Sequence, residues 1–240
     1  MPDRDFSGKV GVITGASSGI GLAVARELHS MGMHLVLSAR RKELLTTVGQ
    51  EMQAAILVGD IADPGMPKKL LDLALSIHKR CDVVFNNAGI IETGPIGSID
   101  IDKVCAMVRV NVEAAYRVAY TFVRHFLSRG RGHLLNTSSV LGTKVRLNAG
   151  AYCGTKFAVE ALSEALRMEV AGTAVGITCI EPGLAMTDLH RDLPEHPSKL
   201  MNISKPLQPE DVARCVRFVL TRPEHVRIPK IMVLPGEHQI

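Results

Sequence analysis

The chain has 240 residues, of which 46% are hydrophobic and 22% charged, and this suits one α/β domain with a sizeable core. Its net charge of +4 comes from 28 basic and 24 acidic residues spread along the chain, without the block of like charges that would indicate a nucleic-acid-binding surface. Trp is absent and aromatic residues make up only 4%, which also argues against a base-stacking surface.

The first residues lack the basic and apolar regions of a secretory signal, and the five cysteines form no CxxC pair. No uncharged run approaches the roughly 20 residues that a membrane-spanning helix needs. We therefore expect a cytoplasmic protein with reduced thiols and no membrane segment. The nine histidines show no HExxH or comparable spacing, so we expect no metal site.

Short apolar runs alternate with helical patterns from one end of the chain to the other. Strands are expected at residues 10–14, 34–38, 55–58, 82–85, 133–136, 176–180 and 231–234. Helices are expected at residues 20–31, 42–52, 68–78, 101–128, 151–170 and 209–220. This alternation predicts a single-domain (1–240), Rossmann-like α/β fold, with a doubly wound parallel sheet of about seven strands flanked by helices.

A glycine-rich turn with GxxxGxG spacing joins the first expected strand to the first helix. Its glycines let the backbone approach a pyrophosphate, and the helix N-terminus supplies unpaired N–H groups. Such a turn can be purely structural, but its place between strand and helix favours dinucleotide binding. The expected contacts there are Gly15, Ser17, Ser18, Gly19, Ile20 and Gly21.

The end of the second strand indicates which dinucleotide is bound. NAD enzymes usually place an acid there for the ribose hydroxyl, whereas this chain has Arg40 and Arg41, and we expect no acid in reach of them. Guanidinium groups suit the 2′-phosphate of NADP(H). The alternative is a solvated pair that begins a helix.

Further motifs follow in order, each on the expected element. They are Asn86-Asn87-Ala88-Gly89, Asn111, Ser138-Ser139, Tyr152-x-x-x-Lys156, and Pro182-Gly183 with Thr187 beyond it. Together with the glycine turn, they resemble the short-chain dehydrogenase/reductase family over essentially the whole chain. The resemblance implies a strand order of 3-2-1-4-5-6-7 and a homodimer or homotetramer. Within the family, the chain looks most like NADP-dependent 3-hydroxy-acid, serine and clavulanate dehydrogenases.

Tyr152 and Lys156 are four residues apart, so a helix places both on one face. A free tyrosine has a pKa of about 10, and a neighbouring ammonium lowers it toward the range of a working acid. Ser139, at the end of the fifth strand, is expected to hold the substrate oxygen. The alternative for Tyr152 and Lys156 is an exposed pair on a solvated helix.

The resemblance implies further roles. Lys156 would bind the nicotinamide ribose, and the backbone carbonyl of Asn111 would hold a water linking Lys156 to solvent; a simple helix kink at Asn111 is the alternative. The expected coenzyme contacts also include Asp60, Ile61, Asn87, Ala88, Gly89, Pro182, Gly183 and Thr187, although each could be a turn residue.

The substrate pocket is less determined by the sequence. The segment 184–208 has no clear periodicity and is expected to be a lid or binding loop, or else a surface excursion. Four residues could hold a carboxylate or phosphate of the substrate, or could be rim charges: Lys144, Arg146, His190 and Arg191.

We thus expect an NADP(H)-dependent oxidoreductase that reduces a ketone or aldehyde, or oxidises the matching secondary alcohol. One alternative is a catalytically inactive NADP(H)-sensing protein, which would typically lack the Tyr or the Lys. Another is an epimerase or dehydratase, whose extended relatives usually carry a further C-terminal domain.

Overall fold

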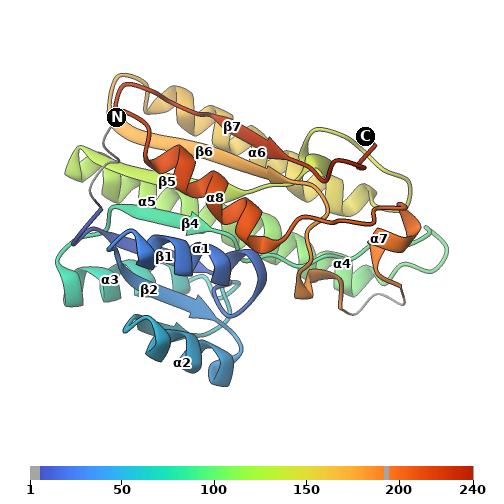
Figure 1. The fold of residues 1–240 in the computed structure, drawn as a ribbon, viewed down its shortest axis with the longest axis horizontal. Coiled ribbons are helices and arrows are strands. Elements are labelled where there is room, and N and C mark those ends of the chain that lie inside the picture. The colour runs from blue at the N-terminus through green and yellow to red at the C-terminus, as the bar shows by residue number, and fades with distance from the viewer. Residues whose placement is uncertain (1–5, 192–194, 240) are drawn as a thin grey trace.

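Seven strands form one sheet in the computed structural model, which describes residues 6–191 and 195–239. Their order is β3-β2-β1-β4-β5-β6-β7 and every neighbouring pair is parallel (Figure 1). The strands are β1 (Val10–Thr14), β2 (His34–Ala39), β3 (Ala55–Val58), β4 (Val83–Asn86), β5 (Arg131–Thr137), β6 (Ala174–Pro182) and β7 (Lys230–Val233). The predicted fold class and strand order are confirmed.

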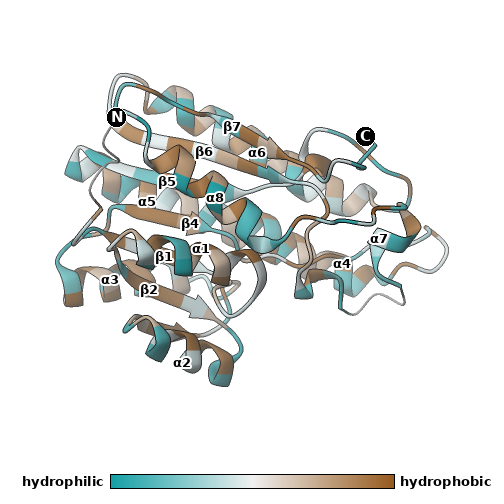
Figure 2. Ribbon diagram, in the orientation of Figure 1, coloured by the Kyte–Doolittle hydropathy of each residue, from teal (hydrophilic) through white to brown (hydrophobic). Residues whose placement is uncertain are grey.

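Helices cover both faces of the sheet. The helices α1 (Gly19–Ser30), α2 (Lys42–Glu51) and α8 (Pro209–Leu220) pack on one face. The helices α3 (Met66–His78), α5 (Ala115–Arg129) and α6 (Gly150–Glu169) pack on the other. Figure 2 shows hydrophobic colour concentrated on the strands, whereas the helices alternate between hydrophobic and hydrophilic residues.

The central strand β1 shows how the sequence fills both cores. Val12 joins the cluster beneath α3, α5 and α6, whereas its neighbour Ile13 joins the cluster beneath α1 and α8. Successive side chains of a strand point to opposite faces, so a strand covered by helices on both sides needs an unbroken apolar run. The polar groups of the site therefore gather at the carboxyl ends of the strands.

The single helix expected over residues 101–128 is divided into three parts. They are α4 (Ile101–Val108), a π-helical segment η1 (Arg109–Ala114) and α5. Asn111 lies in η1, and its side-chain amide donates to Ile90 O (2.8 Å) and accepts from Ile90 N (2.9 Å). It also donates to Thr155 Oγ1 (3.2 Å). The interruption that the sequence places at Asn111 is thus a π-helix, a rare element that is frequently found at functional sites.

The segment 184–208, predicted to be a loop, forms short helices in its described residues, and residues 192–194 lie outside them. The short helices are η3 (Asp188–His190) and α7 (Pro197–Leu200), and a bridge pairs Ala185 with Leu207. A further short helix, η2 (Val140–Gly142), follows β5. In Figure 1, α4 and α7 lie at the end of the molecule toward which the strand arrows point, and this is where the site lies.

Candidate active site

A cavity of about 670 Å³ opens at the carboxyl ends of the strands, within the size range of small-molecule sites. The predicted catalytic and coenzyme-binding residues that line it are Gly15, Ser17, Ser18, Gly19, Ile20, Arg40, Arg41, Asp60, Ile61, Asn87, Ala88, Gly89, Ser139, Tyr152, Lys156, Pro182, Gly183 and Thr187. The candidate substrate-binding residues Lys144, Arg146, His190 and Arg191 line it as well. Two predicted residues do not line it: Gly21 packs against Gly15, and Asn111 hydrogen-bonds to Ile90. The fold therefore gathers nearly all of the motif residues around one space.

The glycine turn fits a pyrophosphate. Gly15 and Gly19 adopt left-handed φ values of +68° and +55°, which favour glycine. A Cβ on Gly21 would overlap the carbonyl oxygen of Gly15, so Gly21 serves the close packing of the turn. The N-cap of α1, Ser18, makes no side-chain capping hydrogen bond, which leaves the first N–H groups of α1 available to an anion.

Thr14 fixes the end of β4 against the end of β1. Its hydroxyl accepts hydrogen bonds from the backbone N–H of Asn87 (2.9 Å) and of Ala88 (3.0 Å). The side-chain amide of Asn87 donates to Thr14 O (3.1 Å), and Thr137 donates to Asn87 Oδ1 (3.1 Å). This part of the cavity wall is therefore braced by polar contacts between three neighbouring strand ends.

The expectation that no acid lies in reach of the two arginines is wrong, because the fold brings an aspartate to each of them. Arg40 lies 3.9 Å from the carboxylate of Asp60, at the end of β3. Arg41 pairs with Asp188 at 2.8 Å and also donates to the hydroxyls of Ser17 and Ser18. The folding of β3 and of the segment after β6 against the end of β2 brings these acids in, which no local pattern indicates.

The side chains of Ser139, Tyr152 and Lys156 meet in the cavity. Tyr152 and Ser139 both line the cavity, and the Ser139 hydroxyl accepts from the N–H of Leu141 at 3.1 Å. Lys156 donates to the carbonyl of Thr137 at 2.9 Å, and its Nζ lies 5.8 Å from the centre of the Tyr152 ring. Residues from the end of β5, from η2 and from α6 thus converge on one point.

Burial dominates the protonation of both central groups. It raises the pKa of Tyr152 to about 12, while the contact with Ser139 and the charge of Arg146 lower it. Burial also lowers the pKa of Lys156 to about 8, against the raising effects of Cys179 and Glu160. The lowering that we expected Lys156 to exert on the pKa of Tyr152 does not outweigh burial in this structure.

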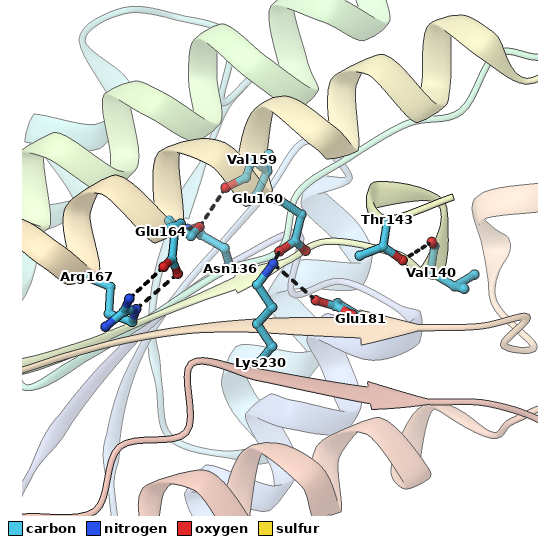
Figure 3. A network of polar contacts seen from close by, with 10 residues as sticks. Asn136, Val140, Thr143, Val159, Glu160, Glu164, Arg167, Glu181 and Lys230 are labelled. Carbon is cyan, nitrogen blue, oxygen red and sulfur yellow. Dashed lines mark hydrogen bonds and ion pairs between the residues drawn. The ribbon is translucent and has the colours of Figure 1, made fainter. Parts of the chain in front are cut away.

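A cluster of Glu160, Glu181 and Lys230, drawn in Figure 3, was missed in the sequence. Lys230 of β7 lies 2.8 Å from the carboxylate of Glu160 on α6 and 4.0 Å from that of Glu181 on β6. Burial raises the pKa of Glu181 to about 7, and the charge of Glu160 acts in the same direction. Glu160 is one helical turn beyond Lys156, so the cluster contributes negative charge directly behind the candidate catalytic lysine.

Other lining residues also escape sequence reasoning. His238 and Gln239 of the C-terminal segment line the cavity, and a Cβ on Gly183 would lie 2.7 Å from His238 Nδ1. No motif near residue 238 predicts that His238 lines the cavity, because its position depends on the path of the chain after β7.

Metal-binding clusters and membrane-spanning helices are both absent from the part of the chain that the structure describes. No group of three or more His, Cys, Asp or Glu side chains there could hold a metal ion. No helix among residues 6–191 and 195–239 is long and apolar enough to cross a membrane.

Comparison with known proteins identifies the family. The model of the short chain dehydrogenase family matches residues 9–198. This chain belongs to that family. The match spans the glycine turn, the Asn-Asn-Ala-Gly motif, Ser139, and the Tyr152 and Lys156 pair, so the resemblance given by the motifs is confirmed and the chain is a member of an oxidoreductase family.

Relatives of this short-chain dehydrogenase differ in length. An uncharacterized oxidoreductase of Staphylococcus aureus (strain USA300) is 33% identical over 230 residues, which are 95% of this chain and 97% of that protein. The glycine betaine reductase ATRR of Emericella nidulans is 33% identical over 250 residues. That alignment covers 100% of this chain and 20% of the relative, so the chain spans about a fifth of the reductase.

Solved short-chain dehydrogenases share the fold. The closed form of a serine dehydrogenase complexed with NADP⁺ superposes with a TM-score of 0.90 at 26% identity, covering 96% of each chain. A 3-ketoacyl-(acyl-carrier-protein) reductase from Brucella melitensis complexed with NADH has a TM-score of 0.88 at 26% identity, covering 97% of this chain and 99% of the other. Both nicotinamide coenzymes thus occur among these neighbours.

Proposed function

We propose that this short-chain dehydrogenase is an NADP(H)-dependent oxidoreductase that reduces a ketone or aldehyde, or oxidises the matching secondary alcohol. The observation that carries the proposal is the convergence of Ser139, Tyr152 and Lys156 in the same cavity as the glycine turn and Arg40. When bound, the nicotinamide supplies or accepts the hydride.

Tyr152 acts as the general acid in the direction of reduction. Its pKa of about 12 keeps the phenol protonated at neutral pH, which is the form that can donate to a carbonyl oxygen. Ser139 lines the same cavity and holds the same oxygen as negative charge develops on it. In oxidation the roles reverse, and the phenolate accepts the proton of the alcohol.

Lys156 keeps a positive charge beside the phenol. With a pKa of about 8 it is mostly protonated at pH 7, and its ammonium stabilises the phenolate that Tyr152 leaves after donating its proton. Lys156 would also bind the nicotinamide ribose. The backbone carbonyl of Asn111, in the π-helix, would hold a water that links Lys156 to solvent, as the family resemblance implies.

The preference for NADP(H) rests on the two arginines at the end of β2. The side chain of Arg40 is 58% exposed and lines the cavity, and its pairing with Asp60 at 3.9 Å is loose. A weakly paired guanidinium at this position suits a 2′-phosphate. The NADP⁺ complex of the serine dehydrogenase supports this preference, and the NADH complex of the ketoacyl reductase makes it worth testing.

The deciding experiment follows the oxidation of NADPH and of NADH spectrophotometrically over a panel of ketones, aldehydes and keto acids. We expect turnover with NADPH that exceeds turnover with NADH by at least tenfold in kcat/KM. A preference for NADH would overturn the assignment of NADP(H) as coenzyme but would leave the proposed oxidoreductase activity standing. Binding of NADPH without turnover of any carbonyl compound would instead favour the inactive NADP(H)-sensing protein.

A homo-oligomer, dimer or tetramer, is part of the proposal. The helices α5 and α6 leave several large apolar side chains exposed, namely Tyr120, Leu127, Phe157 and Met168. Exposed apolar groups of this kind are typical of surfaces that another chain covers. Light scattering coupled to size exclusion measures the mass, and a monomer at micromolar concentration contradicts this part.

A further inference from the structure

Arg146 brings a positive charge to the wall of the cavity and has no acidic partner among residues 6–191 and 195–239. It lies between η2 and α6 and lines the cavity together with Lys144 and Val145. Its guanidinium contacts Met201 Sδ at 3.3 Å, and it forms no ion pair with any residue that the structure describes. By contrast, Arg80 and Arg167 each lie 2.6 Å from a carboxylate.

The guanidinium of Arg146 lies among groups from three separate elements. Burial is the largest cause of the pKa shifts of Tyr152, His190 and His238, and the charge of Arg146 lowers the pKa of all three. Tyr152 belongs to α6, His190 to η3, and His238 to the segment after β7. Because all four residues line the cavity, an anion on Arg146 would lie within a small molecule's length of the Tyr152 hydroxyl.

The two histidines add hydrogen-bonding capacity beside this charge. The Nδ1 atoms of His190 and His238 are buried and have no hydrogen-bond partner among the described residues. Burial lowers the pKa of His190 to about 4 and also lowers that of His238, so both rings are neutral at pH 7. Leaving a buried polar atom unpaired costs about 1–3 kcal/mol, which an oxygen of a bound ligand would offset.

The ring of His190 is held in place by its neighbour. It makes an edge-to-face contact with His196, with ring centres 5.4 Å apart. His196 in turn contacts Ser198 Oγ at 2.8 Å through its own Nδ1. The ring of His190 is therefore positioned before a substrate arrives.

We infer that the substrate of this enzyme carries an oxyanion group, a carboxylate or a phosphate, next to the reacting carbonyl or alcohol, and that Arg146 binds this group with His190 and His238. The inference rests on the proposed function. The planar guanidinium suits two-point binding of such a group. The coenzyme's own 2′-phosphate is a different anion, because Arg40 and Arg41 at the end of β2 are the groups proposed for it.

The experiment compares matched substrate pairs in wild type and Arg146→Gln. The carboxylate arm uses acetoacetate and longer 3-keto acids against their methyl esters, and the phosphate arm uses dihydroxyacetone phosphate against dihydroxyacetone. Arg131→Gln is the control, because Arg131 is exposed and begins β5 at the opposite end of the strands. Calorimetric titration of each variant with NADPH gives a second readout that does not depend on turnover.

We expect wild type to prefer one anionic series over its neutral partners. In Arg146→Gln, kcat/KM for that series should fall by about 10- to 100-fold, mainly through KM, since a hydrogen bond to a charged group contributes about 1.5–3 kcal/mol. The neutral partners and the NADPH affinity should change less than threefold, and Arg131→Gln should match wild type. The substrate pair whose anionic member loses kcat/KM in Arg146→Gln shows whether the oxyanion is a carboxylate or a phosphate.

Equal losses for the anionic and the neutral compounds would overturn the inference, and so would reduction of neutral carbonyl compounds with no turnover of any anionic one. In both cases the proposed function would stand. No turnover of any carbonyl compound in wild type would instead overturn the proposed function, and this inference with it.

Discussion

Arg41 and Asp188 form an ion pair of 2.8 Å although 147 residues separate them in the chain. The pair joins the end of β2, where the 2′-phosphate is proposed to bind, to the segment that follows β6. Burial opposes the ionisation of Asp188, but the Arg41 hydrogen bond is the larger effect and lowers the pKa of this carboxyl. Asp188 is therefore ionised at neutral pH and competes with any phosphate for Arg41.

Asp188→Asn tests this competition. Removing the carboxylate charge frees Arg41, so we expect the Kd for NADPH to decrease by roughly 2- to 5-fold, the range of a partly exposed ion pair. The Kd for NADH should not change, because NADH has no 2′-phosphate. Fluorescence titration measures both Kd values. An equal increase in the Kd for NADPH and the Kd for NADH would show that the pair instead stabilises the segment that follows β6.

Tyr152→Phe removes the hydroxyl proposed as general acid while leaving the ring in place. We expect kcat to fall by on the order of 10³-fold, within the range that general acid catalysis contributes. The affinity for NADPH should change little, since the ring still fills its buried site. Turnover near the wild-type level would rule out Tyr152 as the proton donor.

Glu160→Gln tests the acidic cluster behind Lys156. The Glu160 charge raises the pKa of Lys156, Cys179 acts in the same direction, and burial opposes both. Without that charge the pKa of Lys156 falls below about 8, so the loss of reductase activity at alkaline pH should begin at lower pH than in wild type. Glu164→Gln, one turn further along α6 and paired with Arg167, is the control and should leave the pH profile unchanged.

Glu181→Gln should change how stability depends on pH. The pKa of Glu181 is about 7 in the folded chain, above its ordinary value of 4.5, so the folded state holds a proton that the unfolded state has lost between these values. The free energy of unfolding of wild type therefore decreases as pH rises through this window. Urea unfolding at pH 5 and pH 8 measures this dependence. Relative to wild type, the free energy of unfolding of the variant should be higher at pH 8 than at pH 5 by roughly 1–3 kcal/mol. The same gain in the exposed Glu169→Gln would contradict this origin.

Gly21→Ala tests the packing of the glycine turn. The added methyl group would overlap the Gly15 carbonyl and lie 2.7 Å from Asn87 Nδ2, so the backbone must shift. We expect a loss of about 1–3 kcal/mol in the free energy of unfolding, the usual effect of overpacking, together with weaker NADPH binding. Gly97→Ala, where nothing lies within 4 Å, is the matched control and should change stability by less than about 0.5 kcal/mol.

The parts of this protein that could be predicted are those with a local signature. Apolar runs predict strands, the glycine turn lies at a fixed strand-to-helix junction, and Tyr152 and Lys156 are one helical turn apart. The cluster of Glu160, Glu181 and Lys230 could not be predicted, because it forms only when α6, β6 and β7 pack together. The same holds for Asp188, whose partner Arg41 lies on another element far away in the sequence.

The π-helical segment η1 has a consequence for how this chain tolerates insertions and deletions. One residue more or less in a continuous helix rotates everything beyond it by about 100°, since a helix has 3.6 residues per turn. Deleting one residue from η1 would restore ordinary α-helical geometry but would rotate the residues on one side of the deletion relative to those on the other. Either the Asn111 amide would turn away from Ile90 and Thr155, or the apolar side of α5 would turn away from the sheet. The π-helical turn thus sets the rotation of α5 relative to α4, so that Asn111 faces the site while the apolar side of α5 faces the sheet.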